Sequence, residues 1–233
     1  MALPRLLSMR RPQLSRTWNA QYAEGRYLDE PPVPFVDDII RIARDAHLSR
    51  GLYVGCGNGR NLVPLRRAGL DLLGLDLSET ALHQAKLRLG PTRSRLVCGT
   101  LEALRPESRF DLIVAIQVFQ HGTREQAHAH IRHAQRRLAV GGSMCVRVNS
   151  VTTDVFPAHE VVERGADDSF TVRYAEGPKT GVDIHFFSGA ELDALFDGFE
   201  VVIPPREDAT ERTPPEPGRW TQWEAIWRRT AAH

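Results

Sequence analysis

Residues 51–61 carry the feature that most constrains how this chain folds, because a short apolar segment runs there into a loop rich in glycine. The apolar residues are Leu52 to Val54, and glycines follow at Gly55, Gly57 and Gly59. Glycine frees the backbone and lets a ligand approach the main chain without meeting a Cβ. A second apolar segment ends at Asp76, 19 residues after Gly57. A glycine loop, a helix, a strand and a terminal carboxylate predict a site for a ribose-bearing ligand at the edge of a parallel sheet.

The glycine spacing separates two classes of ligand-binding fold. Dinucleotide-binding folds use G-x-G-x-x-G, whereas the third glycine here comes one position earlier. This loop resembles the first motif of the class I S-adenosylmethionine-dependent methyltransferases. Leu75–Ser78, Phe110–Val114 and Leu138–Ser143 resemble the family's second motif, its fourth-strand signature and its "L-x-x-G-G" turn. The resemblance implies an α/β fold with a Rossmann-like, seven-stranded, mostly parallel sheet whose last strand is antiparallel.

The same resemblance implies S-adenosyl-L-methionine as the cofactor and places it at the glycine loop. Asp76 is expected to accept hydrogen bonds from both ribose hydroxyls. Family members often have an acid after the third strand that binds the adenine amino group, but Gly99-Thr100 stands there in this chain. Adenine recognition is therefore expected to use Thr100 and backbone groups near Leu101. The expected cofactor-binding residues are Tyr22, Gly55, Cys56, Gly57, Asn58, Gly59, Asn61, Asp76, Leu77, Thr100, Leu101, Gln117 and Val118.

The N-terminal region divides into an arm and a cover for the site. Residues 1–16 contain four arginines and no acid, a composition shared by mitochondrial transit segments and by flexible arms. Two prolines favour the arm, so a single methyltransferase domain is expected over residues 17–233. Trp18 to Gly25 is similar to the "W-x-x-x-Y-x-x-G" segment of tellurite-resistance and thiopurine methyltransferases. This similarity implies a lid over residues 17–34, with Tyr22 near the methionine end of the cofactor.

Apolar spacing and capping residues predict the first helices. One helix is expected over residues 35–48, because its apolar residues fall on one face. Asn58 is a candidate N-cap for the helix after the glycine loop, and Ser78 for the next one. Pro64 requires the helix after the loop either to begin late or to bend.

A later helix is predicted from the capping-box pattern of Thr123 and Gln126. Three histidines, His128, His130 and His133, lie off its apolar stripe. We interpret them as a solvated face rather than as metal ligands, and no metal site is expected.

The C-terminal third departs from simple alternation of strands and helices. Residues 170–174 and 182–186 alternate like two strands, so residues 150–188 are expected to be an insertion that forms a β-hairpin over the pocket. Residues 199–203 and 222–228 are predicted as the last two strands. Residues 204–219 hold five prolines and many charges, which predicts a mobile surface loop.

The acceptor is expected where strand four ends, because ligands of open α/β sheets bind beyond the carboxyl ends of the strands. His121 lies there and is the candidate catalytic residue, to orient or deprotonate the acceptor. A hydrogen-bonded structural histidine is the alternative for each candidate, and it is favoured for His159. The expected substrate-binding residues are Trp18, Arg26, His121, Arg147, Asn149 and His185.

Composition limits the partners. The net charge is +1, which gives no general attraction for nucleic acid. Three cysteines without zinc spacing predict a reduced, cytoplasmic protein. No apolar run reaches the length of a membrane span.

The expected function is in-line transfer of a methyl group to an oxygen, sulfur or nitrogen atom of a small molecule, by a monomer or homodimer. An RNA methyltransferase, a non-catalytic cofactor-binding subunit and an NAD oxidoreductase stay open as alternatives; the glycine spacing counts against the last.

Overall fold

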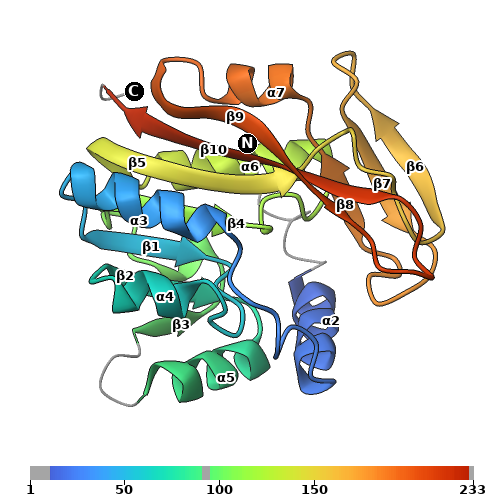
Figure 1. The fold of residues 1–233 in the computed structure, drawn as a ribbon, viewed down its shortest axis with the longest axis horizontal. Coiled ribbons are helices and arrows are strands. Elements are labelled where there is room, and N and C mark those ends of the chain that lie inside the picture. Colours follow the sequence, from blue (N-terminus) through green and yellow to red (C-terminus); the bar gives the residue numbers. More distant parts are fainter. Residues whose placement is uncertain (1–10, 91–94, 231–233) are drawn as a thin grey trace.

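The computed structural model describes residues 11–90 and 95–230, and a seven-stranded sheet forms its centre (Figure 1). The strand order is β3-β2-β1-β4-β5-β10-β9. Strands β1 to β5 pair in parallel, and β10 is antiparallel to both of its neighbours, as predicted. The strands are β1 (Arg50–Val54), β2 (Asp71–Asp76), β3 (Leu96–Cys98), β4 (Phe110–Ile116), β5 (Leu138–Asn149), β9 (Phe199–Glu211) and β10 (Arg219–Arg229).

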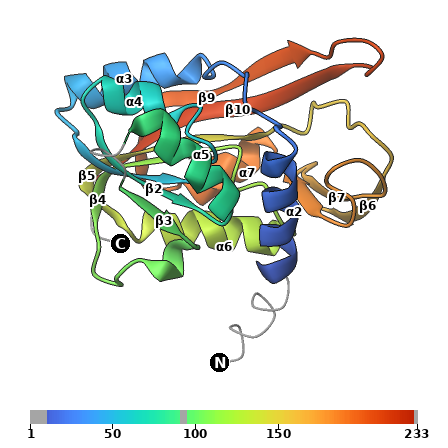
Figure 2. The ribbon, with the colours of Figure 1, turned by 90° about the horizontal axis from the view of Figure 1, so that it is seen from below.

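Helices cover both faces of this sheet. The described helices are α2 (Arg11–Ala23), which lies beyond the strand ends, α3 (Phe35–Asp45), α4 (Leu62–Arg67), α5 (Glu79–Leu89), α6 (Arg124–Gln135) and α7 (Gly189–Leu195), with a short 3₁₀ turn η1 (Leu101–Ala103). Figure 2 shows α3 and α4 on one side of the sheet and α6 on the other. Along β4, Leu112 and Val114 pack in one apolar cluster and Ile113 and Ala115 in the opposite one. Successive side chains of a strand point to opposite faces, so β4 holds two cores together. No helix in the described ranges is long and apolar enough to cross a membrane.

Side chains cap the starts of α5, α6 and α7. Ser78 accepts a hydrogen bond from the Ala81 amide at the start of α5, and Thr123 and Gln126 form the full capping box of α6. The helix after the glycine loop begins late, at Leu62, so Pro64 lies in its first turn, where a backbone N–H has no helical partner.

Two predictions at the N-terminal side are wrong. Asn58 is not an N-cap, because its side chain accepts from the Arg60 amide and donates to the Tyr27 carbonyl instead. Helix α2 begins at Arg11, so residues 11–16 of the predicted arm are helical. Residues 1–10 of that arm lie outside the described residues.

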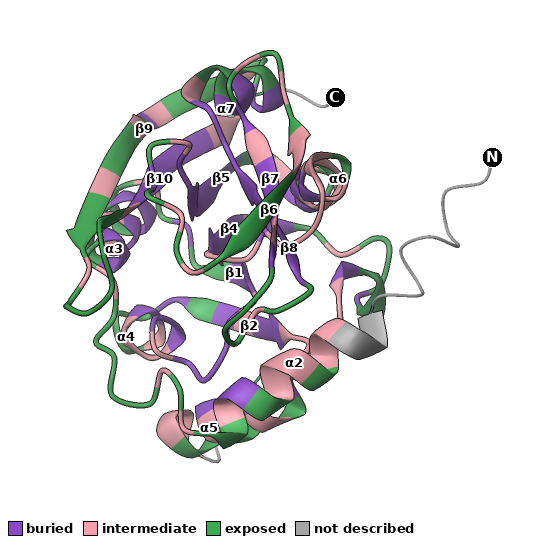
Figure 3. Cartoon of the chain, turned by 90° about the vertical axis from the view of Figure 1, so that its right-hand side faces the viewer, coloured by how far each residue is buried: buried purple, intermediate pink, exposed green. Residues whose placement is uncertain are grey.

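The insertion is a three-stranded antiparallel sheet and not a hairpin. It consists of β6 (His159–Arg164), β7 (Phe170–Tyr174) and β8 (Asp183–Phe186), in the order β6-β7-β8. The pair β7–β8 corresponds to the predicted hairpin. Strand β6 was missed because its residues are exposed or half-buried, without the alternation that marks a strand in sequence (Figure 3). Pairing with β7 stabilises it.

The predicted loop over residues 204–219 is also wrong, since β9 continues to Glu211 and only a short connection remains. Two prolines, Pro204 and Pro205, therefore lie inside a strand. Strand β9 is at the edge of the sheet, where a missing N–H leaves no neighbour unpaired on the outer side. The pairing of β9 with β10 also shifts register between Ile203 and Arg206, which accommodates the prolines as a bulge.

Candidate active site

A cavity of about 540 Å³ lies at the carboxyl ends of the central strands. Its lining includes Val54, Asp76 and Ile116, which are the last residues of β1, β2 and β4. Helix α2 and the insertion sheet lie beyond these strand ends (Figures 1 and 3). The volume is in the range of about 300–1,000 Å³ typical of small-molecule sites. Chain order reverses between β1 and β4, the position where open α/β sheets bind ligands.

The Asp76 carboxylate organises the floor of this cavity. One oxygen accepts from the Gly57 amide and the other from the Ser78 amide, each at 2.8 Å. Burial raises the pKa of Asp76 above its ordinary value, and these backbone bonds oppose that rise. A carboxylate has about four acceptor positions, so each oxygen retains one for a ligand. Asp76 can therefore accept hydrogen bonds from two neighbouring hydroxyls.

Gly57 is the tightest point of the glycine loop. Its φ is +54°, and a Cβ built on it would lie 2.4 Å from the Tyr22 hydroxyl oxygen. No other residue fits there without displacing Tyr22, which reaches from α2 across the loop. Burial, and then the negative charge of Asp76, raise the pKa of the Tyr22 phenol. Tyr22 is therefore a neutral cover over the loop.

Twelve of the thirteen residues predicted to bind the cofactor line the cavity. The exception is Gly59, where a Cβ would lie 3.3 Å from the Cβ of Ala85. This glycine lets the loop pack closely on α5, so its role is structural. Thr100 lines the cavity, but its hydroxyl donates to the carboxylate of Glu102.

His121 faces the cavity with one free ring nitrogen. Its Nδ1 lies 2.9 Å from the Val118 carbonyl oxygen, which only accepts, so this nitrogen carries the hydrogen. The Nε2 atom is buried and has no hydrogen-bond partner among the described residues. Burial, and then the positive charge of Lys179, lower the pKa of His121 to about 3. The imidazole is therefore neutral and presents a lone pair. The Trp18 ring packs against it edge-on, at a centroid distance of 5.0 Å.

Lys179 is a lining residue that the sequence did not reveal. It lies in the connection between β7 and β8, where residue pattern gives no orientation. Burial lowers the pKa of its ammonium group to about 8. Within the described residues this group makes no hydrogen bond or ion pair, so it is available to an anion.

Four predicted substrate-binding residues lie outside the cavity lining. Arg26 is exposed and pairs with Glu24 at 3.6 Å. Arg147 and Asn149 are directed at β10, where each bonds to its cross-strand partner: Arg147 to Glu224 at 2.9 Å, and Asn149 to Gln222 at 3.2 Å. Buried polar groups need such partners, which explains these positions.

The fourth is His185, whose ring is fully buried between Thr171 and Glu191. Trp18 and His121 do line the cavity, and their roles stay predictions. The prediction that the three histidines of α6 form a solvated face is wrong. His130 and His133 line the cavity, and His128 contacts the buried Glu191 at 2.6 Å.

Residues 52–142 match the methyltransferase domain family. Curated relatives include two proteins named ubiquinone biosynthesis O-methyltransferase. The one from Bradyrhizobium diazoefficiens is 35% identical over 74 residues, 31% of this chain and 29% of that protein. The one from Bradyrhizobium sp. (strain ORS 278) is 33% identical over 99 residues, 42% and 38% of the two chains. The matched segments thus span only about a third of these relatives' length.

Solved structures share the fold over most of the chain. TehB from Haemophilus influenzae has a TM-score of 0.62 at 18% identity, covering 90% of this chain and 66% of that one. The 1,6-didemethyltoxoflavin-N1-methyltransferase of Burkholderia thailandensis, with bound 1,6-didemethyltoxoflavin and S-adenosylhomocysteine, has a TM-score of 0.64 at 18% identity, covering 94% and 88%. Magnesium protoporphyrin IX methyltransferase from Synechocystis PCC 6803, with bound S-adenosylmethionine, has a TM-score of 0.63 at 15% identity, covering 94% and 96%.

Proposed function

We propose that this chain is a class I S-adenosylmethionine-dependent methyltransferase that methylates a small molecule, because residues 52–142 match the methyltransferase domain family and the chain shares the fold of solved small-molecule methyltransferases. The observation that carries the proposal is the half-buried carboxylate of Asp76. It lies in the cavity beside the glycine loop, held by two backbone amides, with acceptor positions left for a ribose.

The residues present suit this cofactor. Asp76 would accept from the two ribose hydroxyls, and the bare backbone at Gly57 leaves room for close approach under Tyr22. Thr100 and Leu101 line the wall that follows β3, where the adenine would bind. When bound, S-adenosylmethionine supplies an activated methyl group. The protein then has to bring an acceptor atom into line with that group and exclude water.

Two buried hydrogen-bond acceptor atoms without partners among the described residues indicate which groups the methyl-accepting molecule carries. They are the Nε2 atom of His121 and the amide oxygen of Gln120, and both residues line the cavity. Each would bind an O–H or N–H group, which compensates for its burial. With a pKa of about 3, His121 is a weak base, so it orients the acceptor rather than removing its proton. The ammonium group of Lys179 would bind an anionic group of the same molecule.

The function is tested by calorimetric titration of the chain with S-adenosylhomocysteine and, separately, with NAD. We expect binding of S-adenosylhomocysteine and none of NAD. Transfer of labelled methyl from S-adenosylmethionine is then screened over phenols, carboxylic acids, thiols and amines, each with and without a second acidic group. Tight NAD binding would refute the cofactor, and binding without transfer to any acceptor class would favour a non-catalytic role.

A pH profile tests Lys179. Its pKa of about 8 means that the side chain is charged below pH 8 and neutral above it. The KM for an anionic acceptor should therefore rise as the pH increases through 8. Lys179→Met should raise the KM at pH 7 by about 10-fold or more, the value of one charge-assisted hydrogen bond, and should remove this pH dependence. Lys86→Met, on the exposed side of α5, is the matched control and should change neither. An unaltered KM profile in Lys179→Met would mean that Lys179 does not contact the acceptor.

A further inference from the structure

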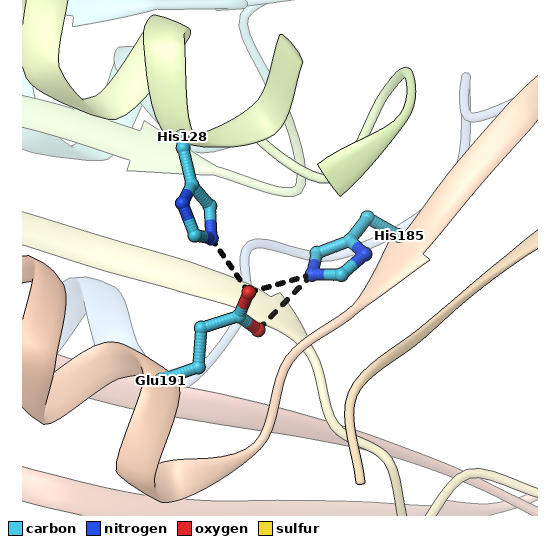
Figure 4. Close-up of side chains that lie close together, drawn as sticks. All are labelled: His128, His185 and Glu191. Carbon is cyan, nitrogen blue, oxygen red and sulfur yellow. Dashed lines mark hydrogen bonds and ion pairs between the residues drawn. The ribbon is translucent and has the colours of Figure 1, made fainter. Parts of the chain in front are cut away.

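A second group of polar side chains lies outside the cavity lining, where three elements meet (Figure 4). It consists of His128 on α6, His185 on β8 and Glu191 on α7. One ligand-type atom of each lies within 4.8 Å of the other two. Figure 4 shows both rings directed at the carboxylate, with His128 Nε2 at 2.6 Å and His185 Nε2 at 3.0 Å. His185 and Glu191 are buried, and His128 is half-buried.

The hydrogen bonds around His185 require a cation at this point. The Thr171 hydroxyl has one hydrogen, which it donates to the Glu163 carboxylate at 3.0 Å. His185 Nδ1, 2.9 Å from the same hydroxyl oxygen, must therefore be the donor to it. A neutral His185 then has a lone pair on Nε2, directed at the Glu191 carboxylate. Two lone-pair groups at 3.0 Å repel, so either a proton or a metal ion lies between them.

The surrounding charges favour a divalent ion over a proton. Arg124 donates to Glu191 and to Asp167, each at 2.7 Å, and its backbone amide donates to Glu163. Asp167 and Glu191 thus share one guanidinium, and Glu163 lies at the backbone amide of the same residue, so these three carboxylates exceed the single cation by two charges. The Glu191 carboxylate accepts from the Arg124 guanidinium and lies within 3.0 Å of a ring nitrogen of both histidines, so it is placed to bind a cation.

We propose that His128, His185 and Glu191 bind a divalent transition-metal ion, with Zn²⁺ as the matching ion. Two imidazoles and one carboxylate are a known zinc ligand set, completed by water. At metal–ligand distances of about 2.1 Å, tetrahedral ligand atoms lie about 3.4 Å apart, so side-chain shifts of about 1 Å would open the site. Thr171 and Glu163 orient His185, and Arg124 holds Glu191, as partners of metal ligands do.

The ion would link the insertion sheet to the helices α6 and α7 of the central domain. Strand β8 belongs to the small sheet, whereas α6 and α7 pack on the central sheet. The connection before β8 carries Lys179 to the cavity. This proposal is independent of the methyl-transfer reaction, because none of the three ligands lines the cavity.

The experiment measures zinc affinity of the full chain. After chelator treatment and dialysis, the protein is titrated with Zn²⁺ against a chromophoric chelator, and bound zinc is measured by elemental analysis. We expect one zinc per chain and a rise in Tm on zinc addition. His128→Ala should abolish tight binding, and Thr171→Val should weaken it by about 10–100-fold, the usual effect of removing an orienting partner. His83→Ala, which removes an exposed histidine of α5, is the matched control and should bind as the parent does.

The alternative is a proton between His185 and Glu191. If the parent retains no zinc and ¹⁵N spectra show His185 protonated on both nitrogens, the metal site is refuted. Equal zinc binding by the parent and His128→Ala would also refute it, since the ion would then lie elsewhere. Circular dichroism of each variant establishes that it is folded, and Glu191→Gln, which keeps the volume but removes the charge, gives a second test.

Discussion

Asp76→Ala is expected to weaken the binding of S-adenosylhomocysteine by at least about 100-fold. Two hydrogen bonds from a ribose to a carboxylate contribute about 1.5–3 kcal/mol each, and 1.4 kcal/mol corresponds to a factor of ten. The substitution also removes the acceptor that holds the Gly57 and Ser78 amides at 2.8 Å, so the glycine loop loses its anchor. Calorimetric titration of parent and variant measures the effect.

Asp71→Ala is the control, because Asp71 begins the strand that Asp76 ends and forms an exposed ion pair with Arg95. Its affinity should equal that of the parent. Asp76→Asn separates the charge-assisted bonds to the ribose from the anchoring of the glycine loop, since an amide keeps one acceptor oxygen for the loop but lacks the charge. If Asp76→Ala binds S-adenosylhomocysteine as the parent does, Asp76 is not the ribose acceptor.

His121→Ala is expected to lower kcat by about 100-fold, the loss that follows when an acceptor is misplaced by about 1 Å. Binding of S-adenosylhomocysteine should be unchanged, because His121 would contact the acceptor and not the cofactor. The pKa of His121 is about 3, so the ring stays neutral between pH 5 and 8. The pH profiles of parent and variant should therefore have the same shape over this range and differ only in height. Steady-state kinetics with a saturating acceptor measures kcat and its pH profile.

His159→Ala is the matched control, since His159 is exposed and its Nδ1 is bonded to the Pro157 carbonyl at the start of β6. It should retain full turnover. An inflection near pH 6.5 that disappears in His121→Ala would show that His121 takes a proton, in place of the orienting role. Equal kcat in His121→Ala and the parent would exclude both roles.

The sequence by itself determined the parallel part of the central sheet and the glycine-loop side of the cavity. Strand β4 is recognisable because burial on both faces demands an unbroken apolar run. Caps such as Ser78 are recognisable because they bond within three residues along the chain. The glycine loop and Asp76 are likewise close in sequence, separated by one helix and one strand, so their spacing predicts that both lie at the same edge of the sheet. In the structure Asp76 accepts from the Gly57 amide there.

The other side of the cavity was decided only by the tertiary structure, because the residues predicted there are positioned by partners far along the chain. Arg147 and Asn149 lie at the end of β5, but β10 places Glu224 and Gln222 opposite them, and each bonds to its cross-strand partner. Lys179 reaches the cavity through a connection whose path no periodicity specifies. A buried polar group takes whichever partner satisfies it, and that partner is fixed by packing rather than by local sequence.

The same reason explains the histidines and the edge strand. His128 and His185 meet Glu191 because α6, β8 and α7 converge, and neither helical spacing nor strand alternation contains that information. Pro204 and Pro205 suggest a loop locally, yet the edge position of β9 tolerates them. Local chemistry thus determined which segments form the strands and the glycine loop, whereas long-range packing decided which polar side chains face the cavity and which pair with one another.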